Sequence, residues 1–410
     1  MRVRELWCSE EKMNNLNCTS GINNTVERDK QYVAGTYNRF PVNIVSGKGS
    51  VVYDCDGKEY IDMGSGIGVT SFGIADGEWQ AAVTEQISKV QHMSNLYYTD
   101  PCSHLAEMLC LKTGMKKVFF SNSGAEANEC AIKAARKYAA QTHGDGCYTV
   151  VTVNNSFHGR TLTTLAATGQ EHYHELFRPL TPGFVSINPD INELKTLAKS
   201  TKIAAVMIEC IQGEGGVLPL GGDFIKSVDK WCKETDVILI IDEVQTGNGR
   251  TGELYSYMNF GITPDIVSTA KGLAGGLPLG ATLFGEKTEN VFGFGDHGST
   301  FGGNPVCCAA ALSIIKRIDK KLLDDVKKKS QLIFSSFEGA SGVESVSGLG
   351  LMVGIKTVKP ASDVVKECIE KGVLCLTAKD KVRLLPALNI PEETLKKAID
   401  IIKTVCAEQV

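Results

Sequence analysis

Short apolar runs alternate with helical patterns through the middle of the chain. The runs are almost continuously hydrophobic, whereas the segments between them repeat apolar residues at helical spacing. Six runs are typical of strands, and they cover residues 116–120, 147–153, 203–211, 237–242, 265–270 and 281–285. Strands of this kind are buried on both faces. The pattern therefore predicts an α/β domain with a mostly parallel sheet over residues 65–295.

The pattern changes after residue 295. An alanine-rich helical stretch covers residues 304–318, and a lysine-rich amphipathic stretch follows at 319–333. Strand candidates at 350–358 and 382–388 complete the region. We expect residues 296–410 to form a smaller α+β domain.

The first 64 residues divide into two parts. Residues 1–25 are polar and rich in asparagine, so we expect them to be disordered or to order by docking elsewhere. Met13 is an alternative start. Residues 26–64 are expected to pack with the smaller domain.

Composition and charge narrow the class of protein. The 410 residues are 43% hydrophobic with a formal net charge of −4, which gives no reason to expect nucleic acid or an anionic membrane as a partner. No apolar run is long enough to span a membrane. Fourteen cysteines occur without a CxxC pair or a Cys/His cluster, which argues against zinc and against a disulfide framework. With no apolar segment typical of a signal peptide, these features predict free thiols and a cytoplasmic protein.

Residues 121–140 follow a predicted strand and open a helix. Ser123 and Glu126 match a capping box, which a well-capped structural helix would also show. The start Ser123-Gly124-Ala125 also exposes backbone N–H groups at the positive end of the helix dipole. Such a helix start is suited to bind a phosphate.

Two charged residues lie in apolar surroundings. Asp242 ends the most hydrophobic run, where its carboxylate needs a cationic partner, either an arginine or a protonated ring nitrogen of a cofactor. Lys271 is the one charged residue within 268–285, among glycines and aliphatic residues. Its stem could extend from a buried strand to water, or its amine could be held near neutral as a Schiff-base lysine requires.

The loop after residues 147–153 carries Phe157 and Arg160. Phe157 could belong to the core and Arg160 to a surface ion pair. If the loop lines a pocket, Phe157 offers a flat face to a ring and Arg160 a clamp for a carboxylate. Two GxGxxG matches, which begin at Gly247 and Gly293, lack the strand, helix and acidic residue that a dinucleotide site needs, so we do not expect dinucleotide binding.

Two residues and three motifs can be taken together, namely Lys271, Asp242, "SGAEAN" (123–128), "FHGR" (157–160) and "GSTFGGNP" (298–305). In this combination the chain resembles the class III (subgroup II) pyridoxal-phosphate-dependent aminotransferases. Matching motifs run in order from "TYNRFP" at residue 36 to "VRLLPAL" at residue 382, and departures at "GIADGEW" (73–79) and Cys210 affect positions without chemistry. The resemblance implies a fold-type I transferase, pyridoxal 5′-phosphate as cofactor, small-molecule substrates and a homodimer with shared active sites.

The resemblance also implies a role for each matching residue. Lys271 would bind the cofactor covalently, and Asp242 would keep its pyridine nitrogen protonated. The cofactor phosphate would be bound by Ser123, Gly124 and Ala125, and by Thr300 from a neighbouring subunit. Phe157 and Val244 would pack on the two faces of the cofactor ring. Gln245 would contact the ring 3′-oxygen. Substrate contacts are implied for Tyr37, Arg160, Glu214 and Arg383.

The expected reaction moves the terminal amino group of N-acetylornithine to 2-oxoglutarate and gives N-acetylglutamate 5-semialdehyde and glutamate, a step of arginine biosynthesis. Glu214 would cover Arg383 and release it to bind the α-carboxylate of 2-oxoglutarate. Residues 64–70 lack the tyrosine with which ornithine δ-aminotransferases contact a free α-amine, but Tyr37 leaves ornithine open. Succinylornithine, 4-aminobutyrate and succinyl-diaminopimelate are further candidate donors. The Glu214–Arg383 pair suits an enzyme with two substrates and so disfavours a mutase or a decarboxylase. The presence of Lys271 and Asp242 disfavours an inactive binding protein.

Overall fold

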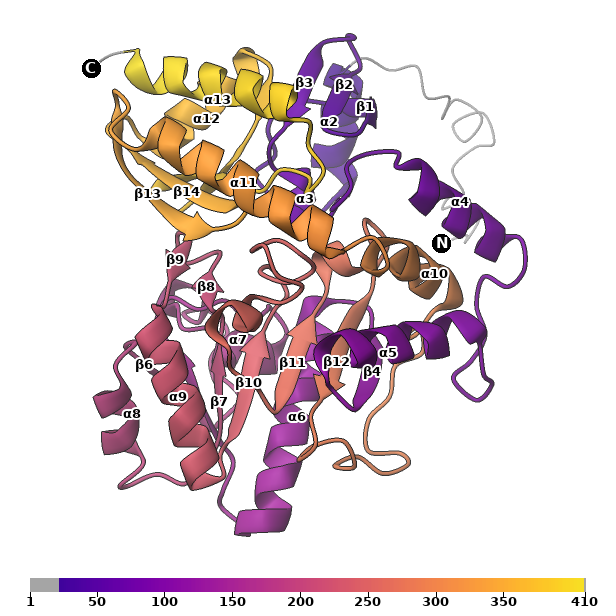
Figure 1. Ribbon diagram of the computed structural model, residues 1–410, viewed down its shortest axis with the longest axis vertical. Coiled ribbons are helices and arrows are strands. Elements are labelled where there is room, and N and C mark those ends of the chain that lie inside the picture. Colours follow the sequence, from indigo (N-terminus) through magenta and orange to yellow (C-terminus); the bar gives the residue numbers. More distant parts are fainter. Residues whose placement is uncertain (1–21, 409–410) are drawn as a thin grey trace, which may run out of the picture.

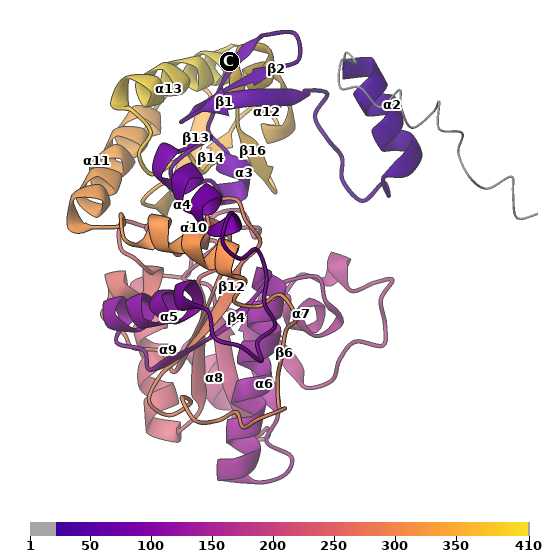
Figure 2. The same ribbon diagram turned by 90° about the vertical axis from the view of Figure 1, so that its right-hand side faces the viewer.

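The computed structural model describes residues 22–408. A large sheet with its helices forms one half, and smaller sheets with the C-terminal helices form the other (Figure 1). The expectations for residues 1–21, including the alternative start at Met13, lie outside the described residues. Residues 22–25 belong to helix α2 (Ile22–Tyr32), which stands apart from the body of the molecule in Figure 2.

Seven strands form the large sheet in the order β4-β12-β11-β10-β7-β5-β6. Neighbouring strands pair parallel from β11 to β6, and β12 runs antiparallel to β11 and β4, which confirms the mostly parallel α/β sheet. Six strands match the predicted apolar runs, whereas β6 is short and partly exposed, so its pattern was too weak to predict. The strands are β4 (Lys117–Ser121), β5 (Thr149–Val153), β6 (Phe184–Ile187), β7 (Ile203–Ile208), β10 (Ile238–Asp242), β11 (Ile266–Thr269) and β12 (Gly280–Phe284).

Helices cover both faces of this sheet (Figure 1). Buried alanines of α6 pack on one face, and helices α5, α8, α9 and α10 share a second core with the other face. Every residue of β7 and β10 is buried. Charged side chains at the carboxyl ends of these strands therefore lie in largely apolar surroundings. The helices of this half are α3 (Ser65–Gly68), α4 (Gly77–Ile87), α5 (Asp100–Thr113), α6 (Gly124–His143), α7 (Leu162–Ala167), α8 (Ile191–Leu197), α9 (Gly222–Thr235) and α10 (Pro305–Ile315).

Segments from both ends of the chain build the other half. One antiparallel sheet has the order β13-β14-β17-β16, and a second has the order β1-β2-β3-β15 with β15 parallel to β3. Helices α11, α12 and α13 share a core with both sheets. The bounds are β1 (Ile44–Lys48), β2 (Val51–Asp54), β3 (Glu59–Asp62), β13 (Val343–Leu349), β14 (Met352–Thr357), β15 (Val373–Leu374), β16 (Leu376–Ala378), β17 (Lys381–Leu384), α11 (Lys320–Phe337), α12 (Ala361–Glu370) and α13 (Glu392–Ala407).

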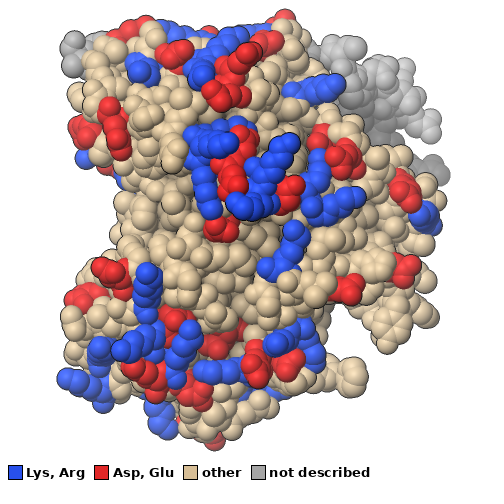
Figure 3. Space-filling model, in the orientation of Figure 1, with Lys and Arg blue, Asp and Glu red and all other residues tan. Residues whose placement is uncertain are grey.

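Helix α10 lies within the range predicted for the C-terminal domain, yet it packs against α4 and α5 in the core of the large sheet. The boundary at residue 295 and the other domain limits stay predictions. Across residues 22–408, no helix is both long and apolar enough to cross a membrane. Acidic and basic side chains are interspersed on the face drawn in Figure 3. Some surface charges of the chain are paired, such as Lys327 with Glu253.

Candidate active site

Loops that follow the parallel strands enclose a cavity of about 550 Å³. In parallel sheets such loops lie beyond the carboxyl ends of the strands, where ligands bind. The cavity brings together most of the residues implied by the family resemblance, namely Tyr37, Ser123, Gly124, Ala125, Phe157, Arg160, Asp242, Val244, Gln245 and Lys271.

Helix α6 begins at the cavity wall. Ser123 is its N-cap and accepts a hydrogen bond from the N–H of Glu126 at 3.2 Å. Glu126 accepts in turn from the N–H of Asn122 at 2.6 Å, so it binds the residue before the cap rather than the cap itself. The N–H groups of Gly124 and Ala125 have no carbonyl within the helix to bind, because they lie in its first turn. They suit an anion at this wall.

Gly124 lets the helix approach the strand end closely. A Cβ atom at this position would lie 2.6 Å from Val244 Cγ1, which is closer than such atoms can come. Val244 and Phe157 both line the cavity and offer it apolar surface. A flat ring can therefore be bound beside the helix start.

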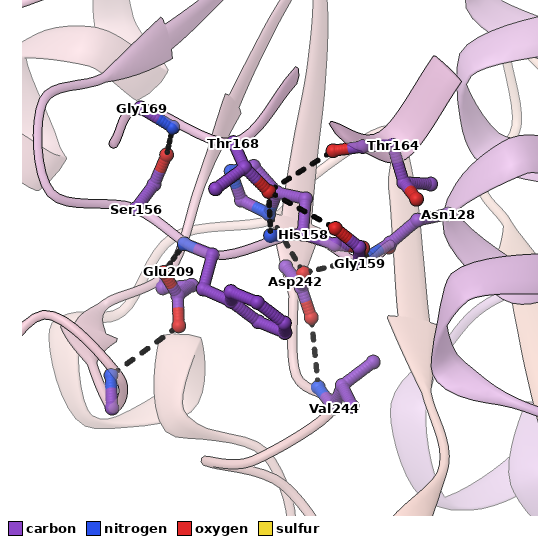
Figure 4. A network of polar contacts seen from close by, with 12 residues as sticks. Asn128, Ser156, His158, Gly159, Thr164, Thr168, Gly169, Glu209, Asp242 and Val244 are labelled. Carbon is purple, nitrogen blue, oxygen red and sulfur yellow. Dashed lines mark hydrogen bonds and ion pairs between the residues drawn. The ribbon is translucent and has the colours of Figure 1, made fainter. Parts of the chain in front are cut away.

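Asp242 is the last residue of β10 and is only 3% exposed. Its Oδ2 atom accepts from Asn128 Nδ2 at 2.7 Å and lies 2.8 Å from His158 Nδ1. Its Oδ1 atom accepts from the N–H of Val244 at 3.0 Å. Figure 4 shows Asn128, His158 and Val244 arranged around the carboxylate. The arrangement holds Asp242 in one place through contacts from three parts of the chain.

A second carboxylate lies in this network. Glu209 follows β7 and accepts hydrogen bonds from the N–H groups of Phe157 at 2.9 Å and Gly213 at 3.3 Å. Burial and repulsion from Asp242 raise the pKa of Glu209 to about 7, against the attraction of His158. Burial opposes the charge of His158, but its hydrogen bond and its attraction to Asp242 and Glu209 outweigh this and raise the pKa of His158.

Lys271 begins the short 3₁₀ helix η4 (Lys271–Leu273) directly after β11. Its φ angle of 46° is in the left-handed region, which is uncommon for a residue other than glycine and is concentrated at functional sites. Burial lowers the pKa of Lys271, and the attraction of Glu214 and Asp242 offsets only part of this shift. A lysine with a lowered pKa has a larger fraction of neutral amine, which is the form that reacts with a carbonyl compound.

Glu214 and Arg383 form an ion pair beside the cavity. Arg383 Nη1 donates to Glu214 Oε1 at 2.5 Å and to Gln245 Oε1 at 3.1 Å, and Gln245 Nε2 donates to Glu214 Oε1 at 3.1 Å. Burial opposes the charge of Glu214, but Arg383 outweighs it and lowers the pKa of Glu214. Glu214 lies on the turn between β8 (Ile211–Gln212) and β9 (Leu218–Pro219).

Two residues at the edge of the cavity are exposed to solvent. The guanidinium of Arg160 lies 5.9 Å from the ring centroid of Phe157 and 5.4 Å from that of Tyr173. Tyr37 is 69% exposed. Both can contact a ligand that enters from solvent.

Thr300 is exposed in the loop after β12, and the residues of the described chain that line the cavity do not include it. The loop is fixed by hydrogen bonds from Asn122 Nδ2 to Ser299 Oγ and from Asn95 Nδ2 to Ser299 O, both at 3.0 Å. The predicted contact of Thr300 with a neighbouring subunit's cofactor stays a prediction.

The whole chain can be compared with known proteins. The family model of class-III aminotransferases matches residues 32–406. This chain is a class-III aminotransferase. The acetylornithine aminotransferase of Haemophilus ducreyi is 47% identical to it over 93% of this chain and 98% of the relative, and that of Methanocaldococcus jannaschii is 42% identical over 94% and 98%.

Solved structures agree with the class-III aminotransferase fold. The ornithine aminotransferase from Toxoplasma gondii ME49 has a TM-score of 0.91 at 30% identity and covers 97% of both chains. The acetylornithine aminotransferase from Elizabethkingia anophelis has a TM-score of 0.86 at 32% identity and covers 95% of this chain and 100% of its own. These likenesses confirm the predicted fold-type I transferase.

Class-III aminotransferases depend on pyridoxal phosphate, and this enzyme uses that cofactor. The site fits the group. Gly124 leaves room for a ring beside Val244, and Asp242 is an anion suited to a protonated ring nitrogen. Asn128, which lines the cavity, has a buried Oδ1 atom without a hydrogen-bond partner among the described residues.

Sequence reasoning gave no role to Asn128, His158 or Glu209 in this aminotransferase. Asn128 is a polar residue among buried alanines of α6, which is a signal that it serves another group. Glu209 comes directly after the apolar strand β7, Asp242 is the last residue of the apolar strand β10, and the register pairs Ile208 with Ile241. Carboxylates at equivalent ends of adjacent parallel strands could therefore have been predicted to be neighbours.

Proposed function

We propose that this class-III aminotransferase transfers the terminal amino group of N-acetylornithine to 2-oxoglutarate. The products are N-acetylglutamate 5-semialdehyde and glutamate, as in arginine biosynthesis. The observation that carries the proposal is the Glu214–Arg383 ion pair beside a cavity that is lined by a second arginine, Arg160. The names of the relatives support the choice of donor.

The ion pair suits two substrates of different charge. With Glu214 on Arg383, a terminal amine can approach while the distant carboxylate of the donor binds Arg160. With the pair open, 2-oxoglutarate meets two guanidinium groups, one for each carboxylate. The side chain of Glu214 is 26% exposed, so it is in contact with solvent and its carboxylate can be hydrated when the pair opens.

Pyridoxal phosphate, when bound, supplies an electron sink that stabilises the carbanion formed at the reacting carbon. Ser123, Gly124 and Ala125 would bind its phosphate, Val244 and Phe157 its ring faces, and Gln245 its 3′-oxygen. Asp242 holds a proton at the ring nitrogen. The ε-amine of Lys271 moves the proton at the reacting carbon as general base, a role worth roughly 10²- to 10⁴-fold in rate.

We also propose a homodimer with shared active sites. Large apolar side chains are exposed near the loop of Thr300 and on the segment tied to it by Asn95, including Leu96 at 86%, Tyr98 at 106% and Phe301 at 59%. Large apolar side chains with this degree of exposure favour a protein interface in this region. Light scattering should give twice the mass of the chain, and an active monomer would contradict the assignment of Thr300.

We further infer a cytoplasmic location. All cysteines of the described chain are free thiols, including partly exposed positions such as Cys55 and Cys110. Free thiols are typical of a reducing compartment. Cell fractionation that recovers the enzyme outside the cytoplasm would contradict this inference.

A donor panel tests the proposed function. Purified enzyme with pyridoxal phosphate and 2-oxoglutarate is assayed for glutamate formation with N-acetylornithine, succinylornithine, ornithine and 4-aminobutyrate. We expect kcat/KM for N-acetylornithine to exceed the others by roughly tenfold or more, about 1.4 kcal/mol. Ornithine is the second candidate because Tyr37 lines the cavity. A preference for ornithine would move the enzyme to another pathway and leave the residue roles unchanged.

A further inference from the structure

Arg250 is a buried arginine without a carboxylate partner among the described residues. It lies on the turn after β10 and is 2% exposed. Burial, with no nearby anion, lowers the pKa of Arg250 to about 10, so it keeps its charge at neutral pH. Its Nη1 atom donates to two backbone carbonyls, Leu351 O at 3.2 Å and Pro386 O at 2.5 Å. Burial of a guanidinium without a paired anion is costly, and the hydrogen bonds to these two carbonyls offset part of that cost.

The backbone of Arg250 contacts the same region. Its carbonyl accepts from the N–H of Leu351 at 2.9 Å. Gly350 permits this approach, because it has a φ angle of 61° and a Cβ atom there would lie 2.4 Å from Arg250 O. Main chain and side chain of Arg250 therefore both hold the peptide that leads into β14.

These contacts lie at the ends of β17, which carries Arg383, and of its neighbour β14. Leu351 precedes β14 and Pro386 follows β17, and the two strands pair with Gly354 opposite Arg383. Gln245, which accepts a hydrogen bond from Arg383, lies on the same turn as Arg250. The turn after β10 thus contacts Arg383 directly through Gln245 and fixes its strands through Arg250.

We propose that Arg250 is a positioning residue that places Arg383 for 2-oxoglutarate. Arg250 is not among the described residues that line the cavity, so it acts through Arg383 rather than on a ligand directly. The inference rests on the proposed use of Arg383 for the α-carboxylate. An arginine suits the position because its guanidinium keeps its charge when buried and one of its nitrogens can donate to two carbonyls, whereas methionine donates no hydrogen bond.

Arg250→Met and Arg250→Lys test the proposal, with kcat/KM measured separately for N-acetylornithine and for 2-oxoglutarate. Arg317→Met is the matched control, because Arg317 is also largely buried in the large half but binds Asp76, at 2.7 Å, rather than β14 or β17. Thermal unfolding and cofactor content are recorded for every variant.

We expect Arg250→Met to lower kcat/KM for 2-oxoglutarate by about tenfold or more and that for N-acetylornithine by less than about threefold. Arg250→Lys should recover part of the loss, and Arg317→Met should lower the melting temperature without separating the two substrates. Equal losses for both substrates, or no loss, would overturn the proposal. If Arg250→Met does not fold, Arg250→Lys replaces it, with a smaller loss expected for 2-oxoglutarate than for Arg250→Met and with equal losses for both substrates again overturning the proposal. A wild-type enzyme that does not use 2-oxoglutarate would instead contradict the proposed function.

Discussion

Asp242 and Glu214 are two carboxylates of one active site that are held in different ways. Asp242 ends a buried strand and is bound by Asn128, by His158 and by the N–H of Val244. Glu214 lies on a turn, has a side chain that is 26% exposed, and binds the side chains of Arg383 and Gln245. The first is almost fully buried and accepts from a backbone N–H as well as from side chains, whereas the second is partly exposed and is bound by side chains alone.

The difference matches the roles proposed for the two carboxylates. A partner for the ring nitrogen must keep its charge and its place through both halves of the reaction, because a preorganised charge stabilises the transition state without rearrangement. A carboxylate that covers Arg383 must leave when 2-oxoglutarate binds. Partial exposure of the Glu214 side chain lowers the cost of that movement, because water can solvate the released charge.

Replacement of the fixed carboxylate should have the largest effect. We expect Asp242→Ala to lower kcat/KM for both substrates by roughly 10³-fold, about 4 kcal/mol, because the ring nitrogen loses its anion and His158 loses its acceptor. Asp229→Ala is the control, since Asp229 is a buried carboxylate of α9 that binds Lys233 at 2.7 Å. A loss confined to one substrate would contradict the role of Asp242.

Glu209 allows the fixed region to be tested through pH. The pKa of Glu209 is about 7 in the folded chain against an ordinary value of 4.5. Because the folded value is higher, the stabilising contribution of its protonation is present below about pH 4.5 and is lost as pH rises to about 7. Glu209→Gln removes this titration.

Unfolding by denaturant at pH 5 to 8 measures the effect. The stability of Glu209→Gln relative to the native chain should rise with pH up to about 7, by at most about 3 kcal/mol. The substitution also removes one carboxylate oxygen that accepts from a backbone N–H, which should shift the free energy of unfolding by the same amount at every pH. Only the change of the stability difference with pH is therefore informative. Parallel curves would show that Glu209 does not titrate in this range.

Removal of the movable carboxylate should change donor preference. Glu214→Ala leaves Arg383 uncovered, so a donor with an α-carboxylate next to its amine gains a partner. We expect the kcat/KM ratio of glutamate to N-acetylornithine to rise roughly tenfold, about 1.4 kcal/mol. Glu253→Ala, which removes a surface partner of Lys327, serves as control. An unchanged ratio would reject the movable pair.

The helix cap should give the smallest effect. Ser123→Ala and Asp319→Ala each remove an N-cap, that of α6 and that of α11, and each should lower stability by about 1 kcal/mol. Only Ser123→Ala should also weaken binding of pyridoxal phosphate, measured by equilibrium titration. If both variants bind the cofactor as the native chain does, Ser123 contributes only to the helix.

Local patterns were sufficient to predict much of the fold and several site residues. A continuous apolar run predicts β10, and a carboxylate at its end predicts a cationic partner, so Asp242 could be found without the structure. Strand β13 was not predicted, because its residues are partly exposed and mix polar with apolar side chains. The periodicity of a strand at the edge of a sheet is weak.

Contacts between distant residues could not be predicted from local pattern. Asn128 and Asp242 are 114 positions apart, and the contact arises because α6 packs against the strands of the sheet. Arg250 lies within a glycine-rich segment that resembles a nucleotide motif, and its partners Leu351 and Pro386 lie more than 100 positions further on. Such contacts depend on how helices and strands that are distant in the sequence pack against one another.

The most direct test of a fixed and a movable carboxylate is the substrate profile of Arg383→Met. We predict that kcat/KM for 2-oxoglutarate falls roughly 100-fold, about 3 kcal/mol, because a charged hydrogen bond to its α-carboxylate is lost. That for N-acetylornithine should stay within about threefold, since the donor is proposed to react while Arg383 is covered by Glu214. An equal loss for both substrates would contradict the account.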